Sequence, residues 1–196
     1  MTIKINSEPM YHTMFDTPVI NRLLFWVSIL FLKLFGWRMA GTLPDIPRFV
    51  MIAAPHTSNW DGVVMLALAF VFKTKIFWMG KSTLFRWPFG WLLRWCGGIP
   101  VDQYGPGGLV EHTIAVFRKK KKMVIAIPPE GTRLKVKQWK TGFYYIALGA
   151  DVPILLGFID YKRKVGGVGP LIYPQGDVES EINTIRAFYN NISGKY

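Results

Sequence analysis

Hydrophobic residues along the chain fall into two kinds of block, which are separated by polar turns. Blocks of about four to eight apolar residues rich in Val, Ile and Phe favour buried strands, and longer blocks with apolar residues three and four positions apart favour helices. Strands are predicted at residues 48–55, 75–79, 99–102, 123–127 and 153–159. Helices are predicted at residues 60–72, 82–95 with an interruption at Pro88, 109–122, 139–148 and 179–190.

The alternation of strands and helices predicts an α/β fold with a mixed, mostly parallel sheet flanked by helices. A length of 196 residues suits one hydrophobic core rather than two. The pattern contains no internal repeat and no low-complexity linker. We therefore expect an N-terminal segment, residues 1–40, followed by a single folded domain, residues 41–196.

The N-terminal segment contains an apolar run at residues 23–32, which resumes after Lys33 at residues 34–37. Crossing a bilayer takes about 20 apolar residues, so this run is too short to span one. Arg22 and Lys33 are eleven positions apart and lie on one stripe of a helix, which leaves its other faces free to enter lipid. This pattern favours a helix that lies in the membrane interface, and a buried core helix is the alternative.

Charge and hydropathy indicate an anionic, membrane-related partner. The sequence has 24 Lys and Arg residues against 12 Asp and Glu, a formal net charge of +12, 51% hydrophobic residues and a mean hydropathy of +0.22. Such a balance suits anionic lipids, phosphorylated substrates or nucleic acid, but no zinc, helix-turn-helix or RNA-binding motif is present, so no nucleic-acid partner is expected. The stretch at residues 84–95 mixes Trp and Phe with Arg, which suits a membrane interface and core packing equally.

Cysteine usage bears on the compartment. Cys96 is the single cysteine, so an intramolecular disulfide is impossible and a reducing compartment is favoured. We expect a peripheral or monotopic protein on the cytoplasmic face of a membrane.

The first polar cluster follows a predicted strand and contains His56 and Asp61. Five residues within one helix turn through about 500°, so the two side chains can meet only if His56 precedes the helix and Asp61 lies in its first turn. An aspartate bonded to one ring nitrogen fixes the tautomer and leaves the other nitrogen free to take a hydroxyl proton. Taken alone, the spacing also fits an ordinary capped turn.

The second polar cluster also stands where a hydrophobic strand ends, and it contains Glu130, Gly131, Thr132 and Arg133. The glycine lets the backbone approach a ligand closely, and Arg133 can clamp a phosphate or carboxylate with two hydrogen bonds. Glu130 can orient a hydroxyl or hold Arg133. A polar turn with a surface ion pair is the simpler interpretation of this cluster alone.

Together and in this order, the clusters resemble the motifs of the glycerolipid acyltransferase family, whose best-known members acylate lysophosphatidic acid. Residues 56–61 match its HxxxxD motif, and residues 129–133, Pro-Glu-Gly-Thr-Arg, match its third motif. The second and fourth motifs correspond to residues 97–103 and 152–156. The resemblance extends over most of the chain, and four ordered motifs make it specific.

The resemblance implies transfer of a fatty acyl group from acyl-CoA or acyl carrier protein to the hydroxyl of a lysolipid, by default lysophosphatidic acid, giving phosphatidic acid. His56 would act as the general base and Asp61 would orient it, without a metal or other cofactor. Membrane lipids would be further partners. Lys81 matches a lysine found between the first two motifs in many members and is a candidate phosphate ligand. The expected substrate-binding residues are Lys81, Gln103, Glu130, Gly131, Thr132 and Arg133.

Two departures from the family pattern concern the acceptor. Gln103 stands where phosphate-reading members usually carry Arg, and Pro55 stands where they often carry Asn. Glutamine can hydrogen-bond a headgroup but cannot neutralise a phosphate dianion, so another lysolipid, an aminoacyl lipid or a glycolipid is the alternative acceptor. More distant alternatives are a non-enzymatic lipid- or nucleic-acid-binding protein and a hydrolase with Ser58 or Cys96 as nucleophile.

Overall fold

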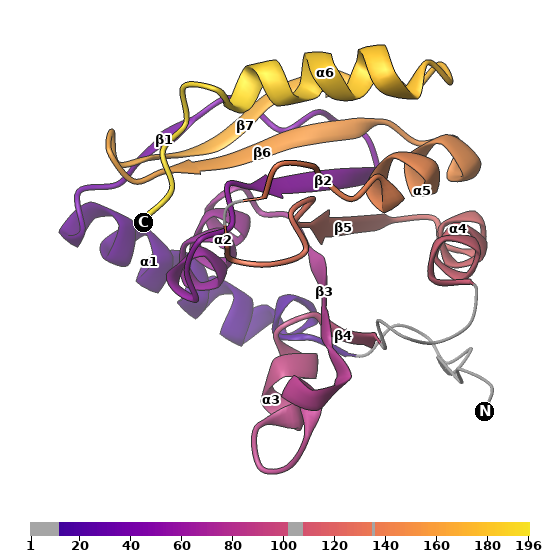
Figure 1. Ribbon diagram of the computed structural model, residues 1–196. Helices are drawn as coiled ribbons and strands as arrows, with labels where there is room; N and C mark the ends of the chain where they lie inside the picture. Colours follow the sequence, from indigo (N-terminus) through magenta and orange to yellow (C-terminus); the bar gives the residue numbers. More distant parts are fainter. Residues whose placement is uncertain (1–11, 102–107, 135) are drawn as a thin grey trace.

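A seven-stranded sheet forms the centre of the computed structural model, which describes residues 12–101, 108–134 and 136–196 (Figure 1). Within the described residues its strands are β1 (Arg38–Ala40), β2 (Arg48–Ala54), β3 (Phe77–Lys81), β4 (Gly98–Val101), β5 (Met123–Ile127), β6 (Ile154–Asp160) and β7 (Val165–Ile172). They lie in the order β1-β7-β6-β2-β5-β3-β4. The helices are α1 (Pro18–Leu34), α2 (Trp60–Val71), α3 (Gly90–Trp95), α4 (Leu109–Lys119), α5 (Gly142–Ala150) and α6 (Val178–Tyr189).

The sheet is mixed and mostly parallel, which confirms the predicted fold class. Strand β2 is central and runs parallel to β5 and β6, with Ile52 opposite both Ile127 and Leu156. Only the β6–β7 pair is antiparallel, and β1 pairs with β7 in parallel at the edge. The carboxyl ends of β2, β5 and β6 therefore lie side by side, and the loops that follow them can meet.

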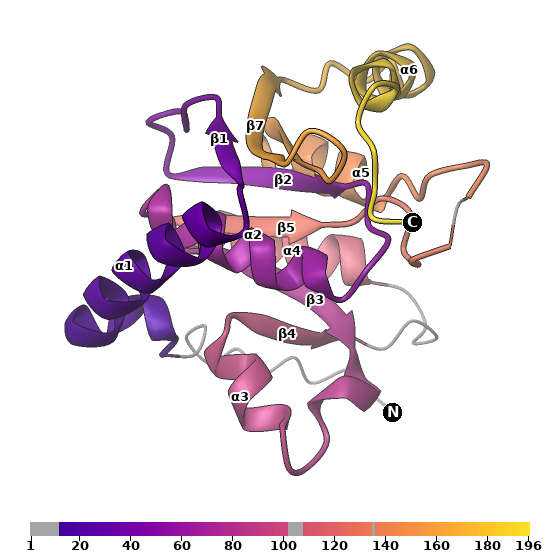
Figure 2. The same cartoon turned by 90° about the vertical axis from the view of Figure 1, so that its left-hand side faces the viewer.

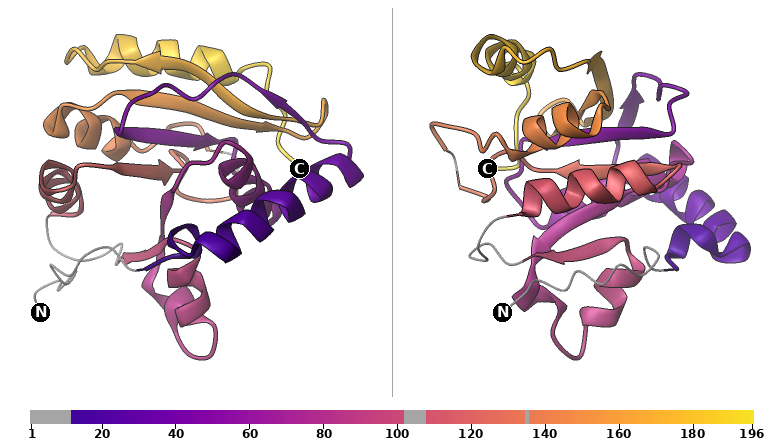
Figure 3. Two further views of the ribbon diagram at one scale, coloured as in Figure 1. Left: turned by 180° about the vertical axis from the view of Figure 1, so that it is seen from behind. Right: turned by 90° about the vertical axis from the view of Figure 1, so that its right-hand side faces the viewer.

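Helices cover both faces of the sheet. On one face, Val50 and Ile52 of β2 share a core with Phe117 of α4, Phe143 of α5 and Ile185 of α6. The right panel of Figure 3 views the molecule from the side on which α4 and α5 lie in front of the sheet. The alternate residues of β2 face the other way, toward α2. This two-sided burial explains why β2 is continuously apolar.

Helix α1 lies outside α2 and is buried along one stripe only. The two helices lie side by side (Figure 2 and the left panel of Figure 3), and Leu32 of α1 packs with Val64 and Leu68 of α2. The opposite face is open, with Leu23 61% and Trp26 62% exposed. None of the helices in the described residues is long and apolar enough to cross a bilayer. The helix is thus partly a core helix, and its contact with a membrane stays a prediction.

The predicted helix over residues 82–95 is interrupted at Pro88, as expected, but the break is longer than one residue and the first part is not α-helical. A 3-10 turn at Ser82–Phe85 is followed by a turn at residues 87–89 and then by α3, which projects beyond the edge strand β4 (Figures 1 and 2). Phe85 is buried, whereas Trp87, Phe89 and Trp91 are 92%, 66% and 68% exposed. The core-packing alternative therefore holds for Phe85 and fails for the three aromatic residues at the tip.

Two strands have no counterpart among the predicted elements. Strand β1 has three residues, and β7 reads Val-Gly-Gly-Val-Gly-Pro-Leu-Ile, in which Gly and Pro conceal the pattern of a strand. A Cβ on Gly167 would lie 1.9 Å from the carbonyl oxygen of Ala40, so the small residue is needed for β1 to pair with β7. Of the other boundaries, α4 ends at Lys119 and α5 begins at Gly142, three residues inside the predicted ends.

Candidate active site

The two polar clusters meet at the carboxyl ends of adjacent parallel strands. His56 follows β2, and Glu130 follows β5. The backbone N–H of His56 donates to Oε1 of Glu130 at 3.4 Å. Open α/β sheets commonly bind ligands at this end of the strands. The fold therefore supplies the proximity that each cluster, taken alone, did not reveal.

His56 and Asp61 form the pair that their spacing predicts. His56 Nδ1 lies 3.1 Å from Asp61 Oδ2. The same oxygen accepts hydrogen bonds from the backbone N–H groups of Thr57 at 2.7 Å and Ser58 at 2.8 Å. The chain reverses sharply before α2 because one carboxylate oxygen binds both backbone donors, and this reversal carries His56 back over the first turn of the helix.

The second oxygen of Asp61 binds a residue that follows β6, the strand next to β2. The Tyr161 hydroxyl donates to Asp61 Oδ1 at 2.7 Å. Tyr161 directly follows β6, and its ring lies edge-on against Trp37 with centroids 5.1 Å apart. Sequence reasoning missed Tyr161 because a single tyrosine after a strand forms no local pattern. The one available signal was its position just after a predicted strand, at residues 153–159.

Asp61 is an anionic acceptor in a buried position. Burial by itself raises the pKa of this carboxyl group, but hydrogen bonds from His56, Tyr161 and the backbone of Ser58 and Thr57 outweigh it and hold the pKa below its ordinary value. An ionised carboxylate can only accept, so Nδ1 of His56 carries the proton and Nε2 is left as an acceptor. The His56 side chain is 29% exposed, against 7% for Asp61, so a substrate can reach the imidazole.

Glu130 is held differently from Asp61. Its Oε1 binds the His56 backbone, while its Oε2 is buried and has no hydrogen-bond partner among the described residues. Burial raises the pKa of Glu130, and the hydrogen bonds it accepts do not compensate. Within the part of the chain that the structure describes, Glu130 makes no ion pair with Arg133, so the guanidinium remains available to a ligand.

A cavity of about 970 Å³ adjoins the His–Asp pair. Its polar lining includes His56, Asp61, Lys81, Thr132, Arg133 and Lys140. Gly131 also lines it and adopts a φ of +63°, a conformation that suits glycine. Lys140 was not singled out from the sequence; a Cβ on Gly131 would lie 3.0 Å from its Nζ, which places this cation against the same loop. Gln103 lies outside the described residues.

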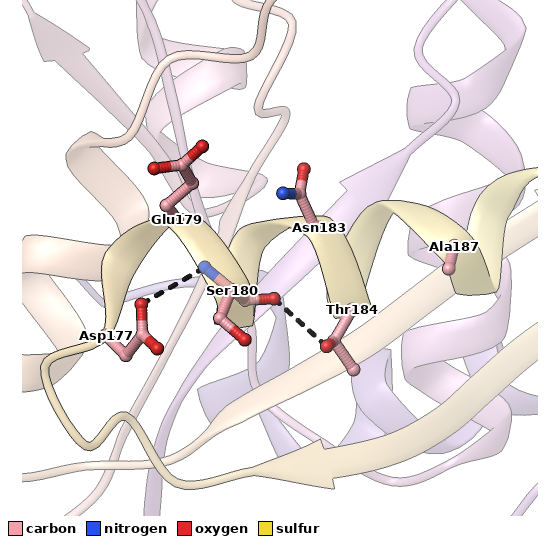
Figure 4. A pocket seen from close by; sticks show the side chains of 6 residues that line it. All are labelled: Asp177, Glu179, Ser180, Asn183, Thr184 and Ala187. Atoms are coloured by element: carbon pink, nitrogen blue, oxygen red, sulfur yellow. Dashed lines mark hydrogen bonds between the residues drawn. The ribbon is translucent and has the colours of Figure 1, made fainter.

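A second surface depression lies on α6 (Figure 4). Its polar groups complete the helix itself: the Asp177 side chain accepts from the Ser180 N–H at 3.2 Å, and the Thr184 hydroxyl donates to the Ser180 carbonyl at 3.0 Å. These are capping and side chain-to-backbone bonds of an exposed helix. The depression on α6 therefore has an explanation in the stability of the helix, and the His–Asp pair remains the candidate site.

Comparison with known proteins agrees with this geometry. Residues 42–155 match the model of the Acyltransferase family. A segment of 116 residues is 35% identical to a 1-acyl-sn-glycerol-3-phosphate acyltransferase of Streptococcus pneumoniae (strain ATCC BAA-255 / R6), covering 58% of this chain and 42% of that protein. The fold resembles the crystal structure of the 1-acyl-sn-glycerophosphate (LPA) acyltransferase PlsC from Thermotoga maritima, with a TM-score of 0.60 and 17% identity over 87% of this chain and 77% of that chain. The family match extends over more than half of the residues of this chain, which therefore belongs to the acyltransferase family.

Proposed function

We propose that the protein transfers a fatty acyl group from acyl-CoA or acyl carrier protein to the hydroxyl of a lysolipid, with lysophosphatidic acid as the first candidate. The observation that carries this proposal is the oriented imidazole of His56 beside a cavity with charged and apolar parts. Lys81 and Arg133 line the charged part, and Leu66 of α2 and Leu93 of α3 contribute to the apolar part. An amphiphile with an anionic headgroup and a long chain complements both.

The proposed reaction follows from the position of Nε2. His56 Nε2 takes the proton of the acceptor hydroxyl while the oxygen attacks the thioester carbonyl, which gives a tetrahedral oxyanion. The oxyanion collapses, the carbon–sulfur bond breaks, and the imidazolium returns the proton to the leaving thiolate. Asp61 holds Nδ1–H throughout and stabilises the imidazolium charge. General-base catalysis of this kind contributes about 10²- to 10⁴-fold.

Neither nucleophile considered for the alternative hydrolase, Ser58 or Cys96, is well placed to act. The Ser58 hydroxyl is buried and accepts from the Trp60 N–H at 3.2 Å, which commits it to the turn before α2. Burial raises the pKa of the Cys96 thiol, which opposes formation of a thiolate. Direct attack by the acceptor on the thioester, with His56 as base, therefore has more support than a covalent acyl-enzyme.

A panel of acceptors tests the proposal. Purified protein is incubated with labelled acyl-CoA or acyl carrier protein and with lysophosphatidic acid, a zwitterionic lysophospholipid, an aminoacyl lipid or a glycolipid, and the extracted lipids are counted. We expect label in the lysophosphatidic acid product. Transfer only to other acceptors would overturn lysophosphatidic acid as the proposed acceptor. If no lipid were acylated, the proposed acyltransferase activity itself would be overturned. Release of free fatty acid alone would favour a hydrolase.

The acceptor headgroup is the finer part of the proposal, and Gln103 is its focus. A charge-assisted hydrogen bond to phosphate contributes about 1.5–3 kcal/mol, which the glutamine forgoes. If Lys81 and Arg133 suffice for a phosphomonoester, then Gln103→Arg should lower the Michaelis constant for lysophosphatidic acid. If the headgroup lacks a dianion, the same substitution should leave that lipid a poor substrate and slow turnover of the true acceptor.

We also propose that the protein works at the cytoplasmic face of a membrane, where its acceptor resides. The exposed apolar face of α1 and the α3 tip, defined as Trp87, Phe89 and Trp91, suit the headgroup region of a bilayer. Residues 62–101 contain five Lys or Arg and no Asp or Glu, which suits anionic lipids. A lipid-binding protein without enzymatic activity would share these surfaces, and the acyl-transfer assay separates the two.

A further inference from the structure

The Tyr161 hydroxyl and the segment that supports it lie outside the four motifs of the family resemblance, yet the hydroxyl binds Asp61 and the segment binds Thr57, next to His56. We propose that Tyr161 is a positioning residue for acyl transfer, which fixes the Asp61 carboxylate and, through it, the His56 ring. The inference rests on the proposed function. It adds a residue from the end of β6 to a site otherwise built by the loops after β2 and β5.

The hydrogen bonds of Asp61 show what Tyr161 contributes. Oδ2 accepts three donors, namely His56 Nδ1 and the N–H groups of Thr57 and Ser58. Oδ1 accepts from Tyr161 alone among the described residues. A carboxylate bound through one oxygen can swing about its Cβ–Cγ bond, whereas a carboxylate bound through both oxygens cannot. The plane of the carboxylate sets the direction in which Nδ1–H points, and hence where Nε2 meets the substrate.

Tyr161 is itself held on three sides. Its ring packs edge-on against Trp37, its backbone N–H donates to the Ser193 carbonyl at 2.9 Å, and its hydroxyl binds Asp61. Burial and the adjacent Asp61 carboxylate raise the pKa of the tyrosine hydroxyl, so it stays protonated and remains a donor wherever the enzyme works. These three contacts fix both the ring and the hydroxyl of Tyr161 in one position.

The C-terminal segment, residues 193–195, supports both partners of this hydrogen bond. Besides binding Tyr161, it reaches the turn before α2, where the Lys195 N–H donates to Thr57 Oγ1 at 2.8 Å. Gly194 lies so close to this turn that a Cβ would stand 2.5 Å from Thr57 Cγ2. The segment therefore joins the end of β6 to the residues that carry His56, and Figure 1 shows the chain returning from α6 to this place.

The test compares Tyr161→Phe with Tyr144→Phe, a matched loss of a tyrosine hydroxyl that accepts from the Gly176 N–H and does not touch the His–Asp pair. The substrates are whichever donor and lysolipid the wild-type protein uses best. We expect Tyr161→Phe to lower kcat about ten- to a hundredfold, with KM for the thioester changed less than about twofold. Tyr144→Phe should leave kcat within about twofold of wild type.

The pH profile distinguishes positioning from a general loss of structure. Without the hydroxyl, more of the Asp61 charge faces Nδ1 and favours the protonated imidazole, so the acidic limb of kcat/KM should move to higher pH. Glu130, the other carboxylate that contacts His56, is unchanged in this variant. Loss of folded protein would instead lower the rate equally at every pH.

The outcomes separate this inference from the proposed function. Wild-type protein that acylates no lysolipid overturns the function, whereas active wild type with an equally active Tyr161→Phe overturns only the role of Tyr161. Gly194→Ala provides a second route if the phenylalanine variant does not fold, because it keeps the hydroxyl but displaces the supporting segment. It should lower kcat by a smaller factor with the same movement of the acidic limb, and wild-type kinetics in Gly194→Ala would count against the proposal.

Discussion

The backbone N–H of His56 donates to Oε1 of Glu130 at 3.4 Å, which joins two loops that stand 74 residues apart in the sequence. The bond is long, and the other oxygen of Glu130 is buried without a partner in the described residues. A carboxylate in such a place costs free energy, which the protein would avoid by using an amide. Glu130 is thus a position at which a charged side chain lowers the stability of the fold.

We expect Glu130→Gln to stabilise the protein at neutral pH. The pKa of Glu130 is raised in the folded state, so its favourable contribution is present below the ordinary glutamate range and is lost as pH rises through the raised pKa. The glutamine variant escapes that loss and should melt at a higher temperature at about pH 7.5, with the difference vanishing near pH 4. Thermal unfolding at both pH values measures this, and an unchanged or lower melting temperature at about pH 7.5 would contradict it.

His56→Ala should abolish acyl transfer without unfolding the protein. The imidazole is partly exposed and forms its side-chain contact through one hydrogen bond to Asp61, so its loss removes little packing. The expected loss of rate is about 10²- to 10⁴-fold. Turnover and circular dichroism are measured on the same preparation. Normal turnover in a folded variant would show that His56 is not the general base.

Asp61→Asn should lower both activity and stability, in contrast to His56→Ala. Four donors converge on the carboxylate, and an asparagine side chain has one oxygen with which to accept them. Its NH₂ group would then face a hydrogen-bond donor inside the turn. We expect a loss of about 1–3 kcal/mol in the free energy of unfolding, measured by urea denaturation. Wild-type stability would mean that the turn before α2 does not depend on the carboxylate.

Removing the aromatic residues of the α3 tip should weaken membrane binding. Trp87 and Trp91 are mostly exposed, and each large side chain that enters the interface contributes about 1.5–3 kcal/mol. Replacing both with serine should reduce sedimentation with anionic liposomes at least about tenfold. Tyr173→Ser, which removes a 57% exposed aromatic residue beyond β7, is the control. Equal sedimentation of the wild type, the double variant and the control would show that the α3 tip does not contribute, and that α1 or another surface binds the membrane.

Arg163→Ala should loosen the turn that follows β6. Burial alone raises the pKa of Asp160, but hydrogen bonds from the backbone and guanidinium of Arg163 hold it below its ordinary value. Arg163 also donates to the Asn191 carbonyl at 2.9 Å. Removing the side chain leaves Oδ2 of the buried Asp160 carboxylate without its guanidinium partner and should lower the free energy of unfolding by about 1–3 kcal/mol.

The neighbouring exposed residue provides the control for that variant. Lys162→Ala should leave the stability within about 0.5 kcal/mol of wild type. In the wild-type protein, the contribution of Asp160 is present above the ordinary aspartate range and disappears as pH falls through the lowered pKa. Urea denaturation of the two variants at neutral pH measures the difference. Equal stability of Arg163→Ala and Lys162→Ala would show that the Arg163 guanidinium does not stabilise the Asp160 carboxylate.

Much of the fold follows from the sequence because its central strands are buried on both faces. Such strands are continuous apolar runs with polar turns at their ends, so β2, β5 and β6 are visible without a structure. Strand β7 escapes the same reasoning because glycine is required for its approach to β1, and glycine is typical of turns. The α3 tip escapes because Phe85 and Trp87 belong to the same aromatic stretch but differ in burial, which depends on tertiary position.

The candidate site divides in the same way. His56 and Asp61 are close in sequence, and the geometry of a strand-to-helix turn is enough to bring them together. Tyr161 lies 100 residues from Asp61, and its role depends on which strands are neighbours. Lys140 is one basic residue among many until the loop at Gly131 brings it to the cavity. Distance along the chain, rather than residue type, separates the residues that could be predicted from those that could not.

The hydrogen bond between Lys195 and Thr57 has a consequence for the order of events during protein synthesis. Its two ends are 138 residues apart, so a nascent chain on the ribosome already carries His56 and Asp61 long before the residues that brace them have left the exit tunnel. Strand β1 likewise can pair only after β7 has been synthesised. Contacts between distant residues form more slowly than local ones because closing a long loop costs entropy. Helix α1 is therefore synthesised before the turn that carries His56 and Asp61 has gained this support from residues 193–195.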